Sequence, residues 1–439
     1  MTAAPTRDST DDTLGATAPP RGMFASLVHR DYRLLWAANF AATFAMQMSQ
    51  VARGWLVYAM TGSAVKLAWV TLSFLAPSIF FSLVGGVLAD RVPKRRIMVL
   101  AQSVNCASTL VLALIVYGGA IQFWHFIAFG LLNGTVLSLS MPARQSIIPA
   151  IVGERFIFNA IALSSASMNL SRVLGPTVAG VTIAWVAGGD TSSTFGVSIV
   201  FFVIAVLYGA AAFGTSLLRT PGDADPRMRG PVLVDLFAGV RHIVDDRVLR
   251  GLFLIAFLAT LFGMPVQFLM PAFSEDALGG GPDDLGLLMG AMGVGAITGS
   301  LVLARMGEAR HKGWLMIGAA FAWALANGLL VLASNVASAL PLAALGGFFS
   351  SAFMSLNNSL IQLSVVDAMR GRVMSVVMMM WGLMPIGVIP ISFLAEATGI
   401  AVALLASSVV LVVVTLLAAA CLPALRAIDR GGSDETAPL

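Results

Sequence analysis

One pattern repeats along almost the whole chain: an apolar run of about 20 residues or more, followed by a short polar turn. About 20 apolar residues make a helix long enough to cross roughly 30 Å of hydrocarbon. Charged residues are 11% and hydrophobic residues 58% of the 439, and the mean hydropathy is +0.88. Soluble domains average about 25% charged residues. The sequence therefore predicts an all-α multi-pass membrane protein.

The apolar runs predict twelve transmembrane helices in two sets of six, on either side of a longer polar interval. The expected spans are residues 34–60, 65–89, 97–118, 123–143, 157–187 and 192–218, then 248–273, 284–304, 313–333, 336–363, 372–396 and 400–424. The predicted organisation is a disordered cytoplasmic tail over 1–33, a six-helix half over 34–218, a linker over 219–247, a second six-helix half over 248–425 and a disordered cytoplasmic tail over 426–439. Apolar residues at helical spacing predict a short interfacial helix in the linker.

The cations decide the expected orientation. Of the 26 Lys and Arg, all but Lys66, Arg53 and Arg172 fall on the side that holds both termini and the even-numbered loops. Because cytoplasmic loops are enriched in Lys and Arg, both termini are predicted to be cytoplasmic. The two halves also repeat: "VLADR" at 87–91 corresponds to "VLARM" at 302–306, as expected of an internally duplicated transporter with its substrate site between the halves.

Two local motifs carry a family resemblance. The turn between the second and third spans reads "GVLADRVPKRR", and the fifth span carries "SRVLGPTVAG" with Gly175, Pro176 and Gly180. The first is similar to the signature of the major facilitator superfamily, with Pro93 replacing its second glycine. The matching residues are Gly86, Leu88, Asp90, Arg91, Lys94 and Arg95. The second resembles the antiporter motif of drug exporters, with Ala179 in place of a glycine.

Further segments resemble one branch of that superfamily, the transmembrane secretion effectors, which include enterobactin exporters. They are "DYRLLW" (31–36), "VARGWLVYAMTGS" (51–63), "MPARQSIIP" (141–149) and "RGRVMS" (370–375). The resemblance implies the major facilitator fold, alternating access, a small-molecule substrate, a monomer, and neither cofactor nor nucleic acid. Proton-driven antiport is the habit of this family, but no carboxylate is predicted near the middle of a span.

The charged turn is predicted to form a conformational latch in this fold. Asp90 is expected to meet the start of the eleventh span, which carries Arg370 and Arg372, because a helix N-terminus and arginines both attract a carboxylate. Gly86, Arg91, Lys94 and Arg95 belong to the same latch. The alternative is that these cations only set the topology.

Charges inside a membrane are functional candidates by default. Arg172 is predicted near the midplane, as a substrate or gating residue or as a structural tie to carbonyls or amides. Arg53 is predicted in the outer leaflet, as a cavity residue or an interfacial anchor. The expected cavity also carries amides, which with the two arginines form the candidate substrate site: Gln47, Gln50, Asn133, Asn357, Asn358 and Gln362.

A positive, amide-bearing and methionine-rich cavity favours amphipathic molecules with an acidic head, such as siderophore-like compounds, lysolipids or acidic drugs. Export of such molecules is the predicted function. The alternatives are multidrug efflux of neutral or cationic compounds, uptake instead of export, and a membrane sensor or scaffold. The sequence has no HExxH motif and no Walker glycine loop, and Cys106 and Cys421 lie far apart. We therefore expect no enzyme, metal site or disulfide.

Overall fold

The computed structural model describes residues 24–188, 194–222, 232–306 and 311–426, and in these ranges the chain is helical, without a strand. A short 3-10 helix, η1 (Ala25–Val28), precedes the first helices. They are α1 (Arg30–Thr61), α2 (Ala64–Arg91), α3 (Lys94–Tyr117), α4 (Phe123–Ala187) and α5 (Thr194–Ser216). The others are α6 (Val232–Asp245), α7 (Arg247–Gly263), α8 (Pro265–Phe268), α9 (Met270–Ala272), a π-helix η2 (Phe273–Ala277), α10 (Pro282–Arg305), α11 (Lys312–Val331), α12 (Val336–Ser364), α13 (Asp367–Gly382), α14 (Pro385–Thr398), α15 (Ile400–Cys421) and α16 (Pro423–Arg426).

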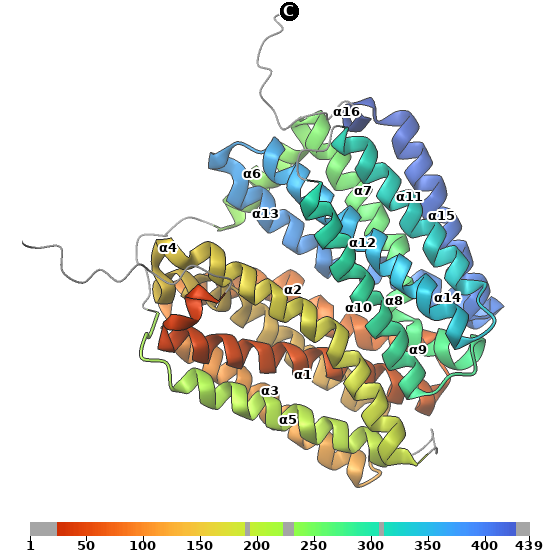
Figure 1. Ribbon diagram of the computed structural model, residues 1–439, viewed down its shortest axis with the longest axis horizontal. Coiled ribbons are helices and arrows are strands. Elements are labelled where there is room, and N and C mark those ends of the chain that lie inside the picture. The colour runs from red at the N-terminus through yellow and green to blue at the C-terminus, as the bar shows by residue number, and fades with distance from the viewer. Residues whose placement is uncertain (1–23, 189–193, 223–231, 307–310, 427–439) are drawn as a thin grey trace, which may run out of the picture.

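The helices form two bundles (Figure 1). Helices α1 to α5 pack mainly on one another, and α7 to α16 do the same; we call these the N-bundle and the C-bundle. The described Lys and Arg outside the spans gather at one end of both bundles, the basic end, with Lys66 as the exception. The opposite end carries Glu275, Asp276 and Glu396, and we call it the acidic end.

The spans predicted at 123–143 and 157–187 are joined without the expected loop, because α4 runs through both. The reversal takes place at Gly153, whose φ of 68° and ψ of 168° are not helical. A glycine adopts positive φ without steric cost, so one residue turns the chain. Three prolines, Pro142, Pro149 and Pro176, lie inside α4 without ending it.

Two predicted spans contain breaks that the sequence did not predict. The span expected at 248–273 is divided into α7, α8, α9 and η2, with prolines at 265 and 271 in the first turns of the short pieces. The span expected at 372–396 is divided between α13 and α14, and Pro385 begins the second piece. Proline removes a backbone donor and clashes with the preceding turn, which explains where these breaks occur. The linker helix predicted from its apolar spacing is present as α6.

Nine helices of the described chain are long and apolar enough to cross a membrane. The second pass of α4, helix α1 and the pair α13–α14 make the structure consistent with the twelve predicted crossings. The all-α membrane fold is confirmed.

The largest hydrophobic core crosses from one bundle to the other toward the acidic end. It includes Trp55 and Tyr58 of α1 together with Phe273 and Leu285 of the C-bundle. Smaller clusters at the basic end, such as the one around Leu35, Met98 and Leu218, stay within the N-bundle. The described hydrogen bonds between the bundles likewise avoid the basic end. In this conformation the bundles are therefore joined at the acidic end and apart at the basic end.

Candidate functional site: a pocket between the bundles

A cavity of about 150 Å³ lies between the bundles, next to their joined part. Both bundles line it, through α1 and α2 on one side and α8, α9 and α10 on the other. Its lining residues are Met46, Gln47, Gln50, Arg53, Gly54, Leu67, Val70, Thr71, Phe74, Leu75, Gln267, Phe268, Pro271 and Met289. A cavity of roughly 150 Å³ holds one benzene-sized group, so this pocket suits the head of a ligand better than a whole amphiphile.

Arg53 is the only charged residue among those that line the pocket. The residue is 9% exposed, and its Nε donates to the Ser49 carbonyl at 3.3 Å, one turn back on α1. The guanidinium carbon lies 5.1 Å from the ring centroid of Phe74 and 5.9 Å from that of Phe129. Desolvated cation–π contacts of this kind are worth about 2 kcal/mol, so these rings hold the guanidinium in place.

One nitrogen of this guanidinium, Nη1, is buried and has no hydrogen-bond partner within the described chain. A buried charged donor without a partner costs several kcal/mol. Arg53, a residue of the pocket lining, therefore keeps a positively charged donor without a described partner, and an acidic group on a ligand that reached this donor would satisfy it.

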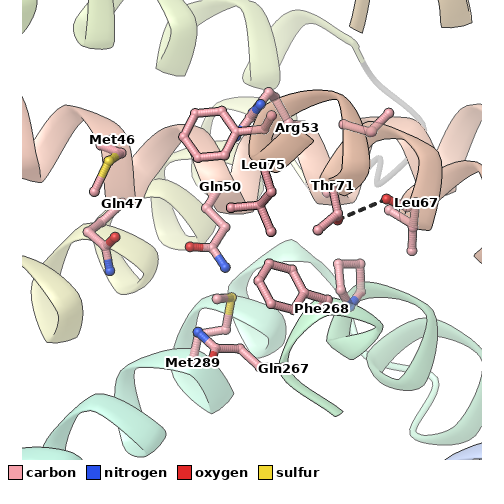
Figure 2. A pocket seen from close by; sticks show the side chains of 14 residues that line it. Met46, Gln47, Gln50, Arg53, Leu67, Thr71, Leu75, Gln267, Phe268 and Met289 are labelled. Atoms are coloured by element: carbon pink, nitrogen blue, oxygen red, sulfur yellow. Dashed lines mark hydrogen bonds between the residues drawn. The ribbon is translucent and has the colours of Figure 1, made fainter. Parts of the chain in front are cut away.

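The remaining lining combines amides with soft apolar side chains. Figure 2 shows Gln50 extending from α1 toward Met289 and Gln267 on the facing helices, with Gln47 and Met46 farther along α1. Amides both donate and accept hydrogen bonds, and methionine adapts to different apolar shapes. Such walls accept a polar head that continues into an apolar body.

The structure places Arg53, Gln47 and Gln50 together, but it leaves Arg172 outside this lining. Arg172 is half-buried on α4 and makes no described hydrogen bond or ion pair. It lies one turn before Gly175, which packs on the Gln47 side chain: a Cβ there would meet Gln47 Cβ at 2.6 Å. Arg172 is thus a neighbour of the pocket, toward the basic end.

The other predicted amides do not line the pocket. Asn133 is buried and donates to the Phe129 carbonyl on its own helix at 2.9 Å. Asn357 is buried in α12 with its carbonyl oxygen unpaired among the described residues. Asn358 is half-buried and Gln362 is exposed. Sequence reasoning missed the rings of Phe74 and Phe129, because nothing in their spacing shows that they face Arg53.

The motif of the fifth span lies where the bundles meet. A Cβ on Gly180 would overlap the Pro282 carbonyl oxygen of α10, and a Cβ on Gly286 would stand 2.7 Å from the Pro176 carbonyl oxygen. Glycines on both helices therefore allow backbone contact between the bundles.

In this conformation Asp90 is not paired with Arg372, so the latch stays a prediction for the conformation in which the basic end is closed. Asp90 makes no hydrogen bond or ion pair with any described residue, Arg372 included. At Gly86, an added Cβ would have no heavy atom within 4 Å. Nothing is described for the Arg370 side chain. The bundles are separated at the basic end, which keeps Asp90 from pairing with Arg372.

Instead, the charged turn is held by its own bundle. The backbone N–H groups of Lys94 and Arg95 donate to the Gly222 and Pro221 carbonyls at 3.0 and 3.1 Å, and Arg95 Nη1 donates to the Leu218 carbonyl at 2.6 Å. The start of the linker is thereby fixed to the turn. Arg91 is exposed and joins none of these bonds.

The same segment is tied to α1 by a carboxylate. Asp31 accepts hydrogen bonds from the backbone N–H groups of Arg219 and Thr220 and from the Thr220 hydroxyl, at 2.8 to 2.9 Å. Burial pushes the pKa of the Asp31 carboxyl up, but the bonds from Thr220 and Arg219, with the nearby Arg30 charge, outweigh it and lower the pKa. The N-bundle is therefore closed on itself at the basic end.

The sequence matches the family model of transmembrane secretion effectors over residues 21–438. It is 25% identical over 370 residues to a staphyloferrin A transporter of Staphylococcus aureus, covering 84% of this chain and 90% of that one. It is 26% identical to a multidrug efflux pump, Tap, of Mycolicibacterium fortuitum (86% and 92%). It is also 26% identical to the enterobactin exporter EntS of Shigella boydii (79% and 80%).

Among solved structures, a bacterial homolog of the human lysosomal transporter Spinster superposes with a TM-score of 0.71 at 15% identity, covering 91% of this chain and 98% of that chain. At this identity the likeness shows the fold alone, which is the major facilitator fold. The relatives of this chain are membrane transporters and not enzymes. Family model, relatives and fold agree: the chain belongs to the transmembrane secretion effectors, multi-pass membrane transporters of the major facilitator superfamily.

Proposed function

We propose that this transporter exports small amphipathic molecules with an acidic head across the cytoplasmic membrane by alternating access. The unpaired, buried Nη1 of Arg53 beside the pocket carries the proposal. An acidic head binds there, with Gln47, Gln50 and Gln267 as further hydrogen-bonding groups, and the apolar body extends along the methionine and phenylalanine walls. Relatives named as a staphyloferrin A transporter and an enterobactin exporter support transport of a small molecule, and the second name supports outward transport.

The orientation and organisation belong to the same proposal. Both termini lie on the cytoplasmic side, since α1 begins and α16 ends at the basic end and cytoplasmic loops are the basic ones. The pocket is then reached from the cytoplasm in this conformation, where a substrate for export is collected. Two six-helix halves, 34–218 and 248–425, move relative to each other around the pocket, and Asp90 pairs with Arg370 or Arg372 only when the basic end closes.

A second candidate is multidrug efflux of neutral or cationic lipophilic compounds. The apolar part of the lining favours it, because Phe74, Phe268, Met46 and Met289 recognise shape rather than charge. The relative named as a multidrug efflux pump points the same way.

Thermal stabilisation of the purified protein by a ligand panel separates the two candidates. The panel contains matched acidic, neutral and cationic amphiphiles, tested on wild type, Arg53→Met and, as the matched control, Arg172→Met. A ligand at about 100 times its dissociation constant stabilises by roughly 2.7 kcal/mol. Stabilisation by acidic members only, lost in Arg53→Met and kept in Arg172→Met, is the expected result. Stabilisation by cationic members that survives Arg53→Met would establish multidrug binding instead.

A further inference from the structure

Side-chain hydrogen bonds join the bundles away from the basic end. One runs from the Thr177 hydroxyl to the Gly286 carbonyl at 3.2 Å, and the others end on carboxylates of the C-bundle. The Tyr58 hydroxyl, near the end of α1, donates to Asp276 Oδ2 in η2. The Ser63 hydroxyl donates to Glu396 Oε1 in α14, and the Val65 N–H donates to the same oxygen at 3.3 Å. An ionised carboxylate is a much stronger acceptor than a neutral carboxyl group. Both contacts are therefore stronger when the acid is ionised and weaken when it is protonated.

These acids are accessible from one side only. Asp276 and Glu396 are exposed at the acidic end, whereas the Tyr58 ring that faces Asp276 is 5% exposed and belongs to the core between the bundles. A proton from the aqueous phase at this end reaches the carboxylates without crossing the protein. The hydrogen bonds that these carboxylates accept lie at the seam, the surface where the two bundles meet at the acidic end.

The charges around the two acids are mostly negative. Among the elements around them, η2 carries the acid Glu275, α2 carries the base Lys66, and α1 carries only the titratable hydroxyl of Tyr58. Helix α15 has no charged residue here. The first turn of α10 adds Asp283 and Asp284. Partial burial and then the charge of Asp276 raise the pKa of Glu275. A like charge next to a carboxyl group disfavours its ionised form, and Glu275 shows this effect.

One segment connects Asp276 with the pocket. Gln267, Phe268 and Pro271 line the pocket, and η2 follows α9 directly in the same broken span. Pro271 packs on Gly54 of α1, where a Cβ would meet its ring at 3.0 Å. A movement of Phe268 or Pro271 at the pocket would therefore also move Asp276, which follows a few residues later in the chain.

We propose that Asp276 and Glu396 are proton-binding sites that decide whether the acidic end is shut. Ionised, they accept the hydrogen bonds from Tyr58 and Ser63 and hold the bundles together. Protonated from the aqueous phase at this end, they release them. Closure is thus favoured at higher pH and is lost as the pH falls. This goes beyond the proposed function, because the gate works in the same sense whatever molecule occupies the pocket.

Distance measurements between two spin labels test the gate without any substrate. Ala120→Cys and Ser334→Cys place the labels in exposed turns of opposite bundles at the acidic end, in a background with Cys106→Ser and Cys421→Ser. The pH is varied from about 8 to about 4, a range that reaches the ordinary pKa values of carboxyl groups. The population with the longer label distance, relative to the population with the shorter one, should rise about tenfold as the pH falls, the effect of losing one charge-assisted hydrogen bond.

The variants assign the effect. Asp276→Asn and Tyr58→Phe should each show the longer distance already at pH 8, and Asp276→Asn combined with Glu396→Gln should remove the pH response. Glu275→Gln, a neighbouring acid without a described bond between the bundles, is the matched control and should keep it. A wild-type distance that is independent of pH would overturn the proposal, as would a full response in the double variant. Neither result depends on whether acidic amphiphiles bind at Arg53.

Discussion

The two ends of the molecule are built in opposite ways from the same kinds of groups. At the acidic end, carboxylates of the C-bundle accept hydrogen bonds from hydroxyls of the N-bundle, and backbones touch at Gly180. At the basic end, the carboxylate of Asp31 accepts its bonds from the N-bundle's own linker segment. In the proposed alternating access, contacts between the bundles have to break in each transport cycle, whereas contacts within a bundle can persist. The acidic end is therefore the proposed gate, and the N-bundle, held together by Asp31 at the basic end, is the unit that moves as a whole when the gate opens.

The largest effect is expected at the backbone contact of the acidic end. In Gly180→Ala the new methyl group would overlap the Pro282 carbonyl oxygen, and such overpacking costs about 1–3 kcal/mol. Closure of this end should weaken by about tenfold or more, with a comparable loss of transport. The spin-label pair at positions 120 and 334 measures the first, and flux in proteoliposomes measures the second.

Gly86→Ala is the matched control, since a methyl group there meets nothing within 4 Å in this conformation. It should leave the distance at the acidic end unchanged. Equal distances in wild type and Gly180→Ala would show that the seam is not as tightly packed as described.

An intermediate effect is expected from the tie within the N-bundle. Asp31→Asn removes a charged acceptor of three hydrogen bonds and should cost about 1–3 kcal/mol of stability, seen as a lower Tm at about pH 7. Because the pKa of Asp31 is lowered in the folded protein, its stabilisation is present above the ordinary aspartate pKa of about 4 and is lost as the pH falls through the folded value.

The difference in Tm between wild type and Asp31→Asn should therefore shrink as the pH falls below about 4. The acidic end should be unaffected, with label distances like those of wild type. A Tm difference that is constant between neutral and acidic pH would contradict this account of Asp31.

The smallest effect on stability is expected at the unformed latch. Asp90 has no described partner when the basic end is open, so Asp90→Asn should change the stability of this conformation by less than about 0.5 kcal/mol. Transport should nevertheless slow, because closing the basic end is proposed to need the carboxylate. A clear loss of Tm would mean that Asp90 already has a stabilising role in the open state, and unchanged flux would remove the latch altogether.

Helix positions could be predicted from the sequence because apolar length is itself the physical requirement for crossing a membrane. The span expected at 97–118 is α3, Lys94–Tyr117. Helix breaks could not be predicted in the same way. Pro142 and Pro176 lie inside α4 without interrupting the helix, which reverses at Gly153 instead, whereas Pro265 and Pro271 lie at the start of new pieces. Neighbouring helices decide whether the backbone groups freed by a proline are satisfied, and the sequence alone does not show those neighbours.

The site was predictable to the extent that it lies on one helix. Gln47, Gln50 and Arg53 follow one another at intervals of three residues on α1, and their shared face could be read from that spacing. The partners of Arg53 come from α2 and α4, and Asp276 comes from a broken span. The sequence predicted no carboxylate in the middle of a span, and that prediction gave no sign that Asp276 and Glu396 would accept hydrogen bonds from Tyr58 and Ser63 where the bundles meet.

Flux through reconstituted protein tests the central claim most directly. Proteoliposomes containing wild type, Arg53→Met or Arg172→Met are given an acidic amphiphile on the side that faces the basic end, and its appearance on the other side is followed, with the neutral methyl ester as the control substrate. The account predicts transport of the acid by wild type, at least a roughly tenfold loss in Arg53→Met, and much less loss in Arg172→Met. Transport of acid and ester at equal rates, unaffected by Arg53→Met, would contradict it.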